Sequence, residues 1–192
     1  MRSLGQLDGE VGRWLDTYDR DLDRAFEACR RGDWLLRIAM ALAIDRRLVV
    51  AAAADAAAIA VRRTAHPDQR PARTVALAAQ FARGESGAPE AWAAAFAASQ
   101  AAHDLARDQP LASEAALAAA AAGFACDPRA DDHFYSQRAY AADAVEHAVR
   151  AHGTERAVGA QRCLQVVRER ITLGVLTSAV SRASSLPPRP RL

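Results

Sequence analysis

Runs of alanine constrain the fold of this chain more than any other feature of its sequence. Alanine supplies about a quarter of the 192 residues and has the highest intrinsic helix propensity of the amino acids. No segment shows the alternation of β-branched and polar residues that is typical of a strand. Because an alanine side chain buries little area, such helices must approach closely, with scattered Leu, Trp, Phe and Val side chains anchoring each contact. The sequence therefore predicts an all-α fold.

Apolar periodicity and helix end signals predict a single domain over residues 1–183, an array or bundle of about eight antiparallel, alanine-rich helices. Gly32 is expected to end the first helix, and Asp33 and Asp45 to cap the next two with their side-chain oxygens. The last helix is expected to bend at Gly174. Residues 184–192 are a Pro-rich tail that cannot continue a helix and should add little stability. The expected helices span residues 7–29, 34–43, 46–63, 71–83, 89–106, 110–126, 130–152 and 155–183.

The charge of the chain is nearly balanced, with 25 basic residues against 23 acidic ones and a formal net charge of +2. The chain therefore lacks the excess of positive charge with which proteins bind the phosphates of nucleic acid, and we expect no nucleic-acid partner. Every basic residue is arginine, which excludes Schiff-base and lysine-nucleophile mechanisms. The three cysteines, Cys29, Cys126 and Cys163, are widely spaced and are expected to be buried, reduced thiols.

Hydropathy predicts a cytoplasmic protein without a membrane-spanning segment. The longest apolar run, residues 48–61, is interrupted by Asp55 and is shorter than the roughly 20 apolar residues that a bilayer requires. The first ten residues contain no apolar core of a signal peptide. Asp55 itself is expected to be buried or half-buried and paired with Arg62 or Arg73, because an unpaired buried carboxylate is costly. The alternative, a solvated Asp55 on a narrow polar stripe, remains open.

A series of less common residue types recurs in a characteristic order between residues 26 and 171. They are Cys29, Trp34, Leu35, Leu36, Asp45, Arg46, Arg47, Asp55, Arg70, Pro71, Phe81, Ala82, Arg83, Gly84, Glu85, Arg162, Cys163, Val167, Arg168 and Glu169. In the order of these residues the chain resembles the immunity proteins of bacterial polymorphic-toxin systems, in the Imm-five-like group. Phe81 stands where the family pattern has tryptophan.

The resemblance implies a non-enzymatic protein that neutralises a cognate protein toxin by stoichiometric binding, without metal or cofactor. It leaves the oligomeric state open. A binding surface of this kind needs a rigid, charge-complementary frame. The expected partner-binding residues are Trp34, Arg46, Arg47, Arg70 and Arg83. For Trp34 the alternative is a core anchor, because it opens an apolar helix.

Two other function classes stay open at this stage. One is a general helical protein–protein interaction or scaffold module. The other is an all-helical HD-type metal phosphohydrolase. Enzymes of that class have metal-binding residues in the order His, His-Asp, Asp, and His66, the His103–Asp104 pair and Asp143 follow a similar order here. Asp143, Glu146 and His147 lie within one helical turn, but the chain has no Glu-x-x-His motif of a di-metal bundle, no glycine-rich phosphate loop and no nucleophile elbow.

Overall fold

The computed structural model describes residues 7, 9–65, 67–127 and 139–184, and these residues form helices and connecting turns without a strand. The expected all-α class is confirmed. The described part contains ten α-helices and one short 3₁₀ helix, where about eight helices were expected. The elements are α1 Gly9–Asp16, α2 Leu22–Ala28, α3 Gly32–Ala41, α4 Arg46–Arg63, α5 Gln69–Arg83, α6 Ala88–Leu105, α7 Pro110–Phe124, α8 Tyr140–Arg150, η3 Gly153–Glu155, α9 Arg156–Arg170 and α10 Leu173–Ser184.

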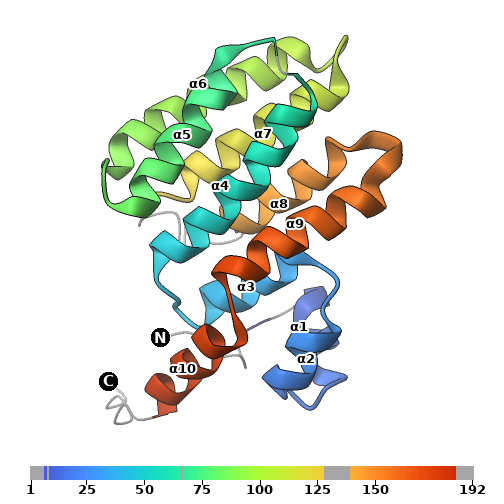
Figure 1. The fold of residues 1–192 in the computed structure, drawn as a ribbon, viewed down its shortest axis with the longest axis vertical. Helices are drawn as coiled ribbons and strands as arrows, with labels where there is room; N and C mark the ends of the chain where they lie inside the picture. The colour runs from blue at the N-terminus through green and yellow to red at the C-terminus, as the bar shows by residue number, and fades with distance from the viewer. Residues whose placement is uncertain (1–6, 8, 66, 128–138, 185–192) are drawn as a thin grey trace.

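Helix α4 lies at the centre of the molecule and packs against α5, α7, α8 and α9 (Figure 1). Its buried residues are mostly alanines, and the same is true of α7, which packs against α4, α5, α6 and α8. Helix α3 lies against α8 and α9, while α10 contacts α2 away from this centre. The long alanine faces therefore form the middle of the core, and the shorter N-terminal helices are added to one side of it.

Small residues set the distance between α7 and its neighbours. A Cβ atom at Gly123 would lie 2.8 Å from Thr74 Cγ2 of α5 and 2.9 Å from the Ala91 carbonyl oxygen of α6. Thr74 is fully buried, and its hydroxyl donates to the carbonyl oxygens of Arg70 and Ala94, so it links α5 to α6. Three helices thus meet at a point where there is no room for a methyl group.

The single helix expected over residues 7–29 is wrong, because the chain turns between α1 and α2. Asp19 and Arg20 both have positive φ angles there, 54° and 57°. Asp21 then caps α2, its side chain accepting from the backbone N–H groups of Asp23 and Arg24. Apolar residues continue at a spacing of three or four through the turn, at Leu15, Tyr18, Leu22 and Ala25, so spacing alone hides the break.

The expected roles of Gly32 and Asp33 are also wrong. Gly32 begins α3 instead of ending the previous helix, since Arg31 is the N-cap residue and makes no side-chain cap bond. Asp33 lies inside the first turn, buried and paired with Arg31 at 2.7 Å. By contrast, Asp45 caps α4 as expected: its Oδ1 accepts from the backbone N–H of Arg47 at 2.9 Å. The bounds of α4 agree with the predicted 46–63.

The long helix expected at 155–183 is divided into α9 and α10 at Ile171 and Thr172, ahead of the bend expected at Gly174. Ile171 is fully buried and leaves helical geometry, with φ −106° and ψ 81°. Thr172 Oγ1 then accepts from the backbone N–H of Val175 at 3.3 Å, which helps to start α10. The expected start of a helix at residue 130 and the tail beyond Ser184 lie outside the described residues.

Asp55 is half-buried and pairs with an arginine, as expected, but the partner is Arg170 of α9. Arg170 Nε donates to Asp55 Oδ2 at 2.9 Å, and the two side chains are 49% and 36% exposed. Neither Arg62 nor Arg73 forms this pair. Within the described ranges, no helix is long and apolar enough to cross a membrane.

Substitution of Gly123 tests the close approach of α5, α6 and α7. Gly123→Ala should lower the free energy of unfolding by about 1–3 kcal/mol, because the added methyl group overpacks the contact and this outweighs the gain in helix propensity. The control is Gly174→Ala in α10, where the nearest atom to the new Cβ would be Thr172 Oγ1 at 3.9 Å. Urea denaturation of both variants measures the difference, and equal stability of the two would contradict the packing described here.

Candidate functional site

Trp34, the one aromatic among the expected partner-binding residues, belongs to a small cluster near the start of α3. It is half-buried, and its ring centroid lies 5.0 Å from that of Trp14 of α1. The guanidinium of Arg31 stacks over its ring at 4.7 Å. Trp34 therefore anchors α1 against α3, which agrees with the core-anchor interpretation, and keeps part of its ring accessible.

Arg46 has a structural task in the described fold. Its Nη1 donates to the carbonyl oxygens of Ala125 at 3.0 Å and Asp127 at 2.6 Å. These carbonyls follow the C-terminal end of α7, where free oxygens and the negative end of the helix dipole favour a cation. Arg46 thus ties the start of α4 to the end of α7.

Arg47 and Arg83 lie close together where α4 begins and α5 ends. Arg47 is exposed, and its guanidinium lies beside Gly84, the left-handed residue that ends α5. Arg83 makes two hydrogen bonds to Glu85, at 2.8 and 2.7 Å. These bonds raise the pKa of Arg83 and lower the pKa of Glu85. This end of the molecule presents exposed charge on a short, defined turn.

Arg70 lies at the opposite end of α5, about 20 Å from Arg83 by the rise of the helix. Its guanidinium donates to Asp68 Oδ2 at 2.8 Å and to Asp104 Oδ2 at 2.9 Å, and these two carboxylates raise its pKa. The five residues expected from sequence therefore do not form one continuous surface. Arg46, Arg47 and Arg83 gather at one end, and Trp34 and Arg70 lie elsewhere.

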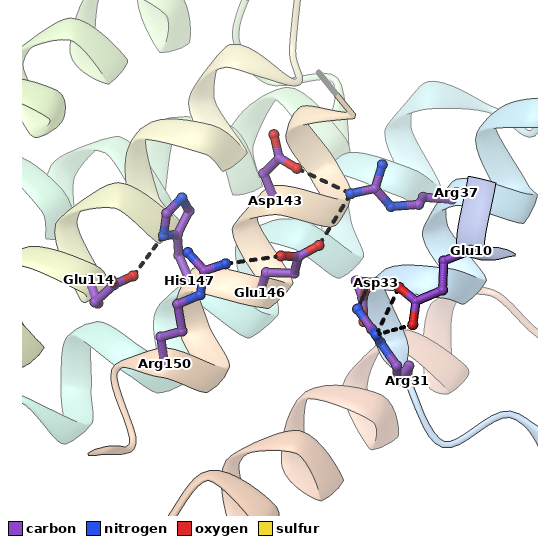
Figure 2. Close-up of polar contacts among 9 residues, drawn as sticks. All are labelled: Glu10, Arg31, Asp33, Arg37, Glu114, Asp143, Glu146, His147 and Arg150. Atoms are coloured by element: carbon purple, nitrogen blue, oxygen red, sulfur yellow. Dashed lines mark hydrogen bonds and ion pairs between the residues drawn. The ribbon is translucent and has the colours of Figure 1, made fainter. Parts of the chain in front are cut away.

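One face of α8 carries a band of ion pairs that sequence reasoning did not assign (Figure 2). Arg37 of α3 donates to Asp143 at 3.4 Å and to Glu146 at 3.2 Å, and Arg150 donates to Glu146 at 3.3 Å. His147 Nδ1 lies 2.7 Å from Glu114 Oε2 of α7. The helical spacing of the acids was visible in the sequence, but the partners come from α3 and α7 and could not be read from it.

An aromatic cluster lies at the start of the same face. The ring of Tyr140 lies 5.3 Å from that of Phe124, which in turn lies 4.8 Å from Trp92 and 5.1 Å from Phe96. Phe96 is 57% exposed, the highest exposure of any large apolar side chain in the described residues. We call these four residues the aromatic cluster. Their signal in the sequence is the four-residue spacing of Trp92 and Phe96, which places both on one helix face but does not indicate that this face meets solvent.

A hollow lies at the other end of α8, where α8 and α9 meet the start of α3. Its volume is about 190 Å³, and four arginines line it: Arg30, Arg31, Arg150 and Arg156. We call it the arginine pocket. Asp33 holds Arg31 in place through two hydrogen bonds, and Glu10 of α1 lies 3.5 Å from the same guanidinium (Figure 2).

The residues suggested for HD-type chemistry are dispersed or already engaged. Asp104 accepts hydrogen bonds from Gln100 and Arg70, which lower its pKa, and Asp143 pairs with Arg37. His66 lies outside the described residues. In residues 7, 9–65, 67–127 and 139–184, no group of three or more His, Cys, Asp or Glu side chains is placed to hold a metal ion.

All three cysteines are buried and free, as expected. Burial raises the pKa of Cys126 and of Cys163 to about 12, and it also raises the pKa of Cys29. Because the thiolate is the nucleophilic form, these thiols are unreactive near neutral pH.

Arg46→Ala should lower the free energy of unfolding by about 1.5–3 kcal/mol, since it removes charge-assisted hydrogen bonds to two carbonyl oxygens. Arg47→Ala is the matched control at the next position and should change stability by less than about 0.5 kcal/mol, because its guanidinium is exposed. Urea denaturation separates the two effects. Equal losses in both variants would contradict the structural role of Arg46.

The cysteine pKa values predict a loss of stability at alkaline pH. A thiol whose pKa is about 12 in the folded state and about 8.5 in the unfolded state stabilises the fold fully below pH 8.5. This contribution is lost as pH rises towards 12, by about 3 kcal/mol for each such cysteine at pH 10.5. The urea midpoint should therefore fall less between pH 8 and 10.5 in Cys126→Ala than in the unchanged protein. An identical fall in both would show that Cys126 does not contribute.

Comparison with known proteins finds no family model that matches the chain, and no curated protein or solved structure matches it either.

Proposed function

We propose that this protein acts by binding, as an immunity protein that neutralises a cognate bacterial toxin, and that the aromatic cluster is the centre of its binding surface. The observation that carries the proposal is the exposed ring of Phe96, supported from below by Phe124 and Trp92. Aromatic side chains of this kind provide most of the binding energy in many interfaces.

The cluster is preorganised for binding. The rings of Trp92, Phe96 and Phe124 contact one another edge to face, and they stand on α6 and α7, which pack closely through alanines. A partner that covers Phe96 would remove apolar surface from water without having to order a flexible loop first. Rigid support of this kind favours tight, stoichiometric binding.

The ion pairs along α8 supply a polar margin beside the cluster. Asp143 lies one turn from Tyr140, and the side chains of Arg37, Asp143 and Glu146 are each 30% exposed. Partly exposed charges at the edge of an interface steer association and select the partner more than they add affinity. A toxin surface with an apolar centre and complementary charges fits this arrangement.

The same groups argue for binding without catalytic turnover. The acids of α8 are committed to Arg37 and Arg150, Glu114 of α7 is committed to His147, and burial keeps the cysteines protonated. Nucleophilic or acid–base catalysis requires a poised group with access to substrate.

Arg47 and Arg83, two of the residues that carry the family resemblance, offer a second exposed and charged surface at the junction of α4 and α5.

Replacement of Phe96 tests the proposed surface. Phe96→Ser should weaken binding to the toxin domain encoded by a neighbouring gene about tenfold or more, because it removes the exposed centre of the cluster. Titration calorimetry measures affinity, and growth of cells that express the toxin measures protection. The matched control is Leu111→Ser, a 44% exposed apolar residue at the opposite end of α7 from Phe124.

The outcomes separate the possible surfaces. Loss of affinity in Phe96→Ser but not in Leu111→Ser supports the aromatic cluster. Full affinity in Phe96→Ser, with loss in an Arg47→Glu/Arg83→Glu variant, would place the interface at the α4–α5 junction. Absence of any binding by the unchanged protein would overturn the immunity function and favour a general helical interaction module.

A further inference from the structure

The arginine pocket concentrates positive charge around one small hollow. Arg30 and Arg31 come from the segment before α3, Arg150 from the end of α8 and Arg156 from the start of α9. The pocket also contains two acids, Asp33 and Glu146, so its lining carries a net charge of +2. Chain segments more than 100 residues apart thus contribute four arginines to the lining of one hollow.

Two of the four guanidinium groups are held in place by the acids. Asp33, almost fully buried, binds Arg31 through both carboxylate oxygens, at 3.2 and 2.7 Å, and Glu146 lies 3.3 Å from Arg150. A guanidinium has five N–H donors, so these contacts leave donors available on both arginines. The acids therefore position Arg31 and Arg150 without saturating them.

The other two guanidinium groups have no acidic partner. Arg30 makes one long hydrogen bond, to the carbonyl oxygen of Glu27 at 3.5 Å, and Arg156 is exposed. Neither forms an ion pair within the part of the chain that the structure describes. Like charges at one site repel one another unless an anion neutralises them. Planar guanidinium groups match the oxygens of phosphate and carboxylate groups.

The floor of the pocket is apolar, formed by Val145, Val149 and Ala160. Its volume of about 190 Å³ is below the roughly 300–1,000 Å³ of pockets for drug-sized ligands. The dimensions therefore suit a small anion, with room for a compact apolar substituent against the floor.

We propose that the arginine pocket is a binding site for a phosphoryl dianion, either free phosphate or a small phosphate monoester. Asp33, Glu10 and Glu146 compensate Arg31 and Arg150, so the two arginines without an acidic partner in the described residues, Arg30 and Arg156, supply the positive charge that a phosphate dianion would neutralise. Arg30 and Arg156 bind it directly, while Arg31 and Arg150 add to the positive charge of the lining. This site does not depend on the aromatic cluster or on a toxin, so it is tested on the protein alone.

Titration with sodium phosphate at pH 8, with sodium chloride adjusted to keep ionic strength constant, tests the site. Calorimetry should show saturable binding with one site per chain, and the thermal unfolding midpoint should rise as phosphate occupies it. An Arg30→Gln/Arg156→Gln variant should bind phosphate at least tenfold more weakly. The matched control is Arg62→Gln/Arg73→Gln, which removes two exposed arginines from α4 and α5.

The variants also separate ligand binding from a structural role. Without phosphate, Arg30→Gln/Arg156→Gln should unfold at the same temperature as the unchanged protein or slightly above it, because repulsion is relieved. Phenyl phosphate identifies the source: tighter binding than inorganic phosphate indicates a monoester, and weaker binding indicates the free ion. A non-saturable response of the unchanged protein, equal weakening in the control variant, or tighter binding of succinate than of either phosphate would overturn the proposal.

Discussion

The structure depends on close contact between alanine faces at the centre of the molecule. Helices α4 and α7 bury long alanine surfaces against their neighbours, and such surfaces gain from dispersion only when the backbones come very near. Small polar groups make this approach possible: the Ser113 hydroxyl donates to the Ala102 carbonyl oxygen at 2.8 Å, and Thr74 bridges α5 and α6. Both are buried and satisfied, so they join the helices without the cost of an unpaired donor. The rigid frame that results supports the aromatic cluster and its exposed member, Phe96.

Arginine joins the ends of helices around this centre. Arg46 binds carbonyl oxygens after α7, and Arg168 of α9 donates to the carbonyl oxygens of Phe26 and Cys29 at 2.6 and 3.2 Å while stacking over the Phe26 ring. A planar group with five donors can serve several carbonyls at once, which a single ammonium group does less well. Two residues that carry the family resemblance therefore maintain the fold, and their presence in the motif does not require them to contact a partner.

Local signals predicted much of this fold but not how its parts meet. Asp45 at the start of α4 and Gly84 at the end of α5 act through their own backbone neighbours, so the sequence placed both helix ends well. The turn at Asp19 and Arg20 and the break at Ile171 depend on packing between distant helices, and apolar spacing continues through both. The candidate binding surfaces were harder to predict from the sequence than the helix ends. Exposure of Phe96 depends on which side of α6 remains uncovered, and the arginine pocket joins segments that only the folded chain brings together.

We propose that the aromatic cluster beside α8 binds the protein partner. Backbone amide chemical shifts, recorded by NMR as the toxin domain is added, test this proposal because they report every surface at once. The largest changes should fall around Phe96 of α6 and along α8 from Tyr140 to His147. Changes confined to the junction of α4 and α5, around Arg47 and Gly84, would contradict it.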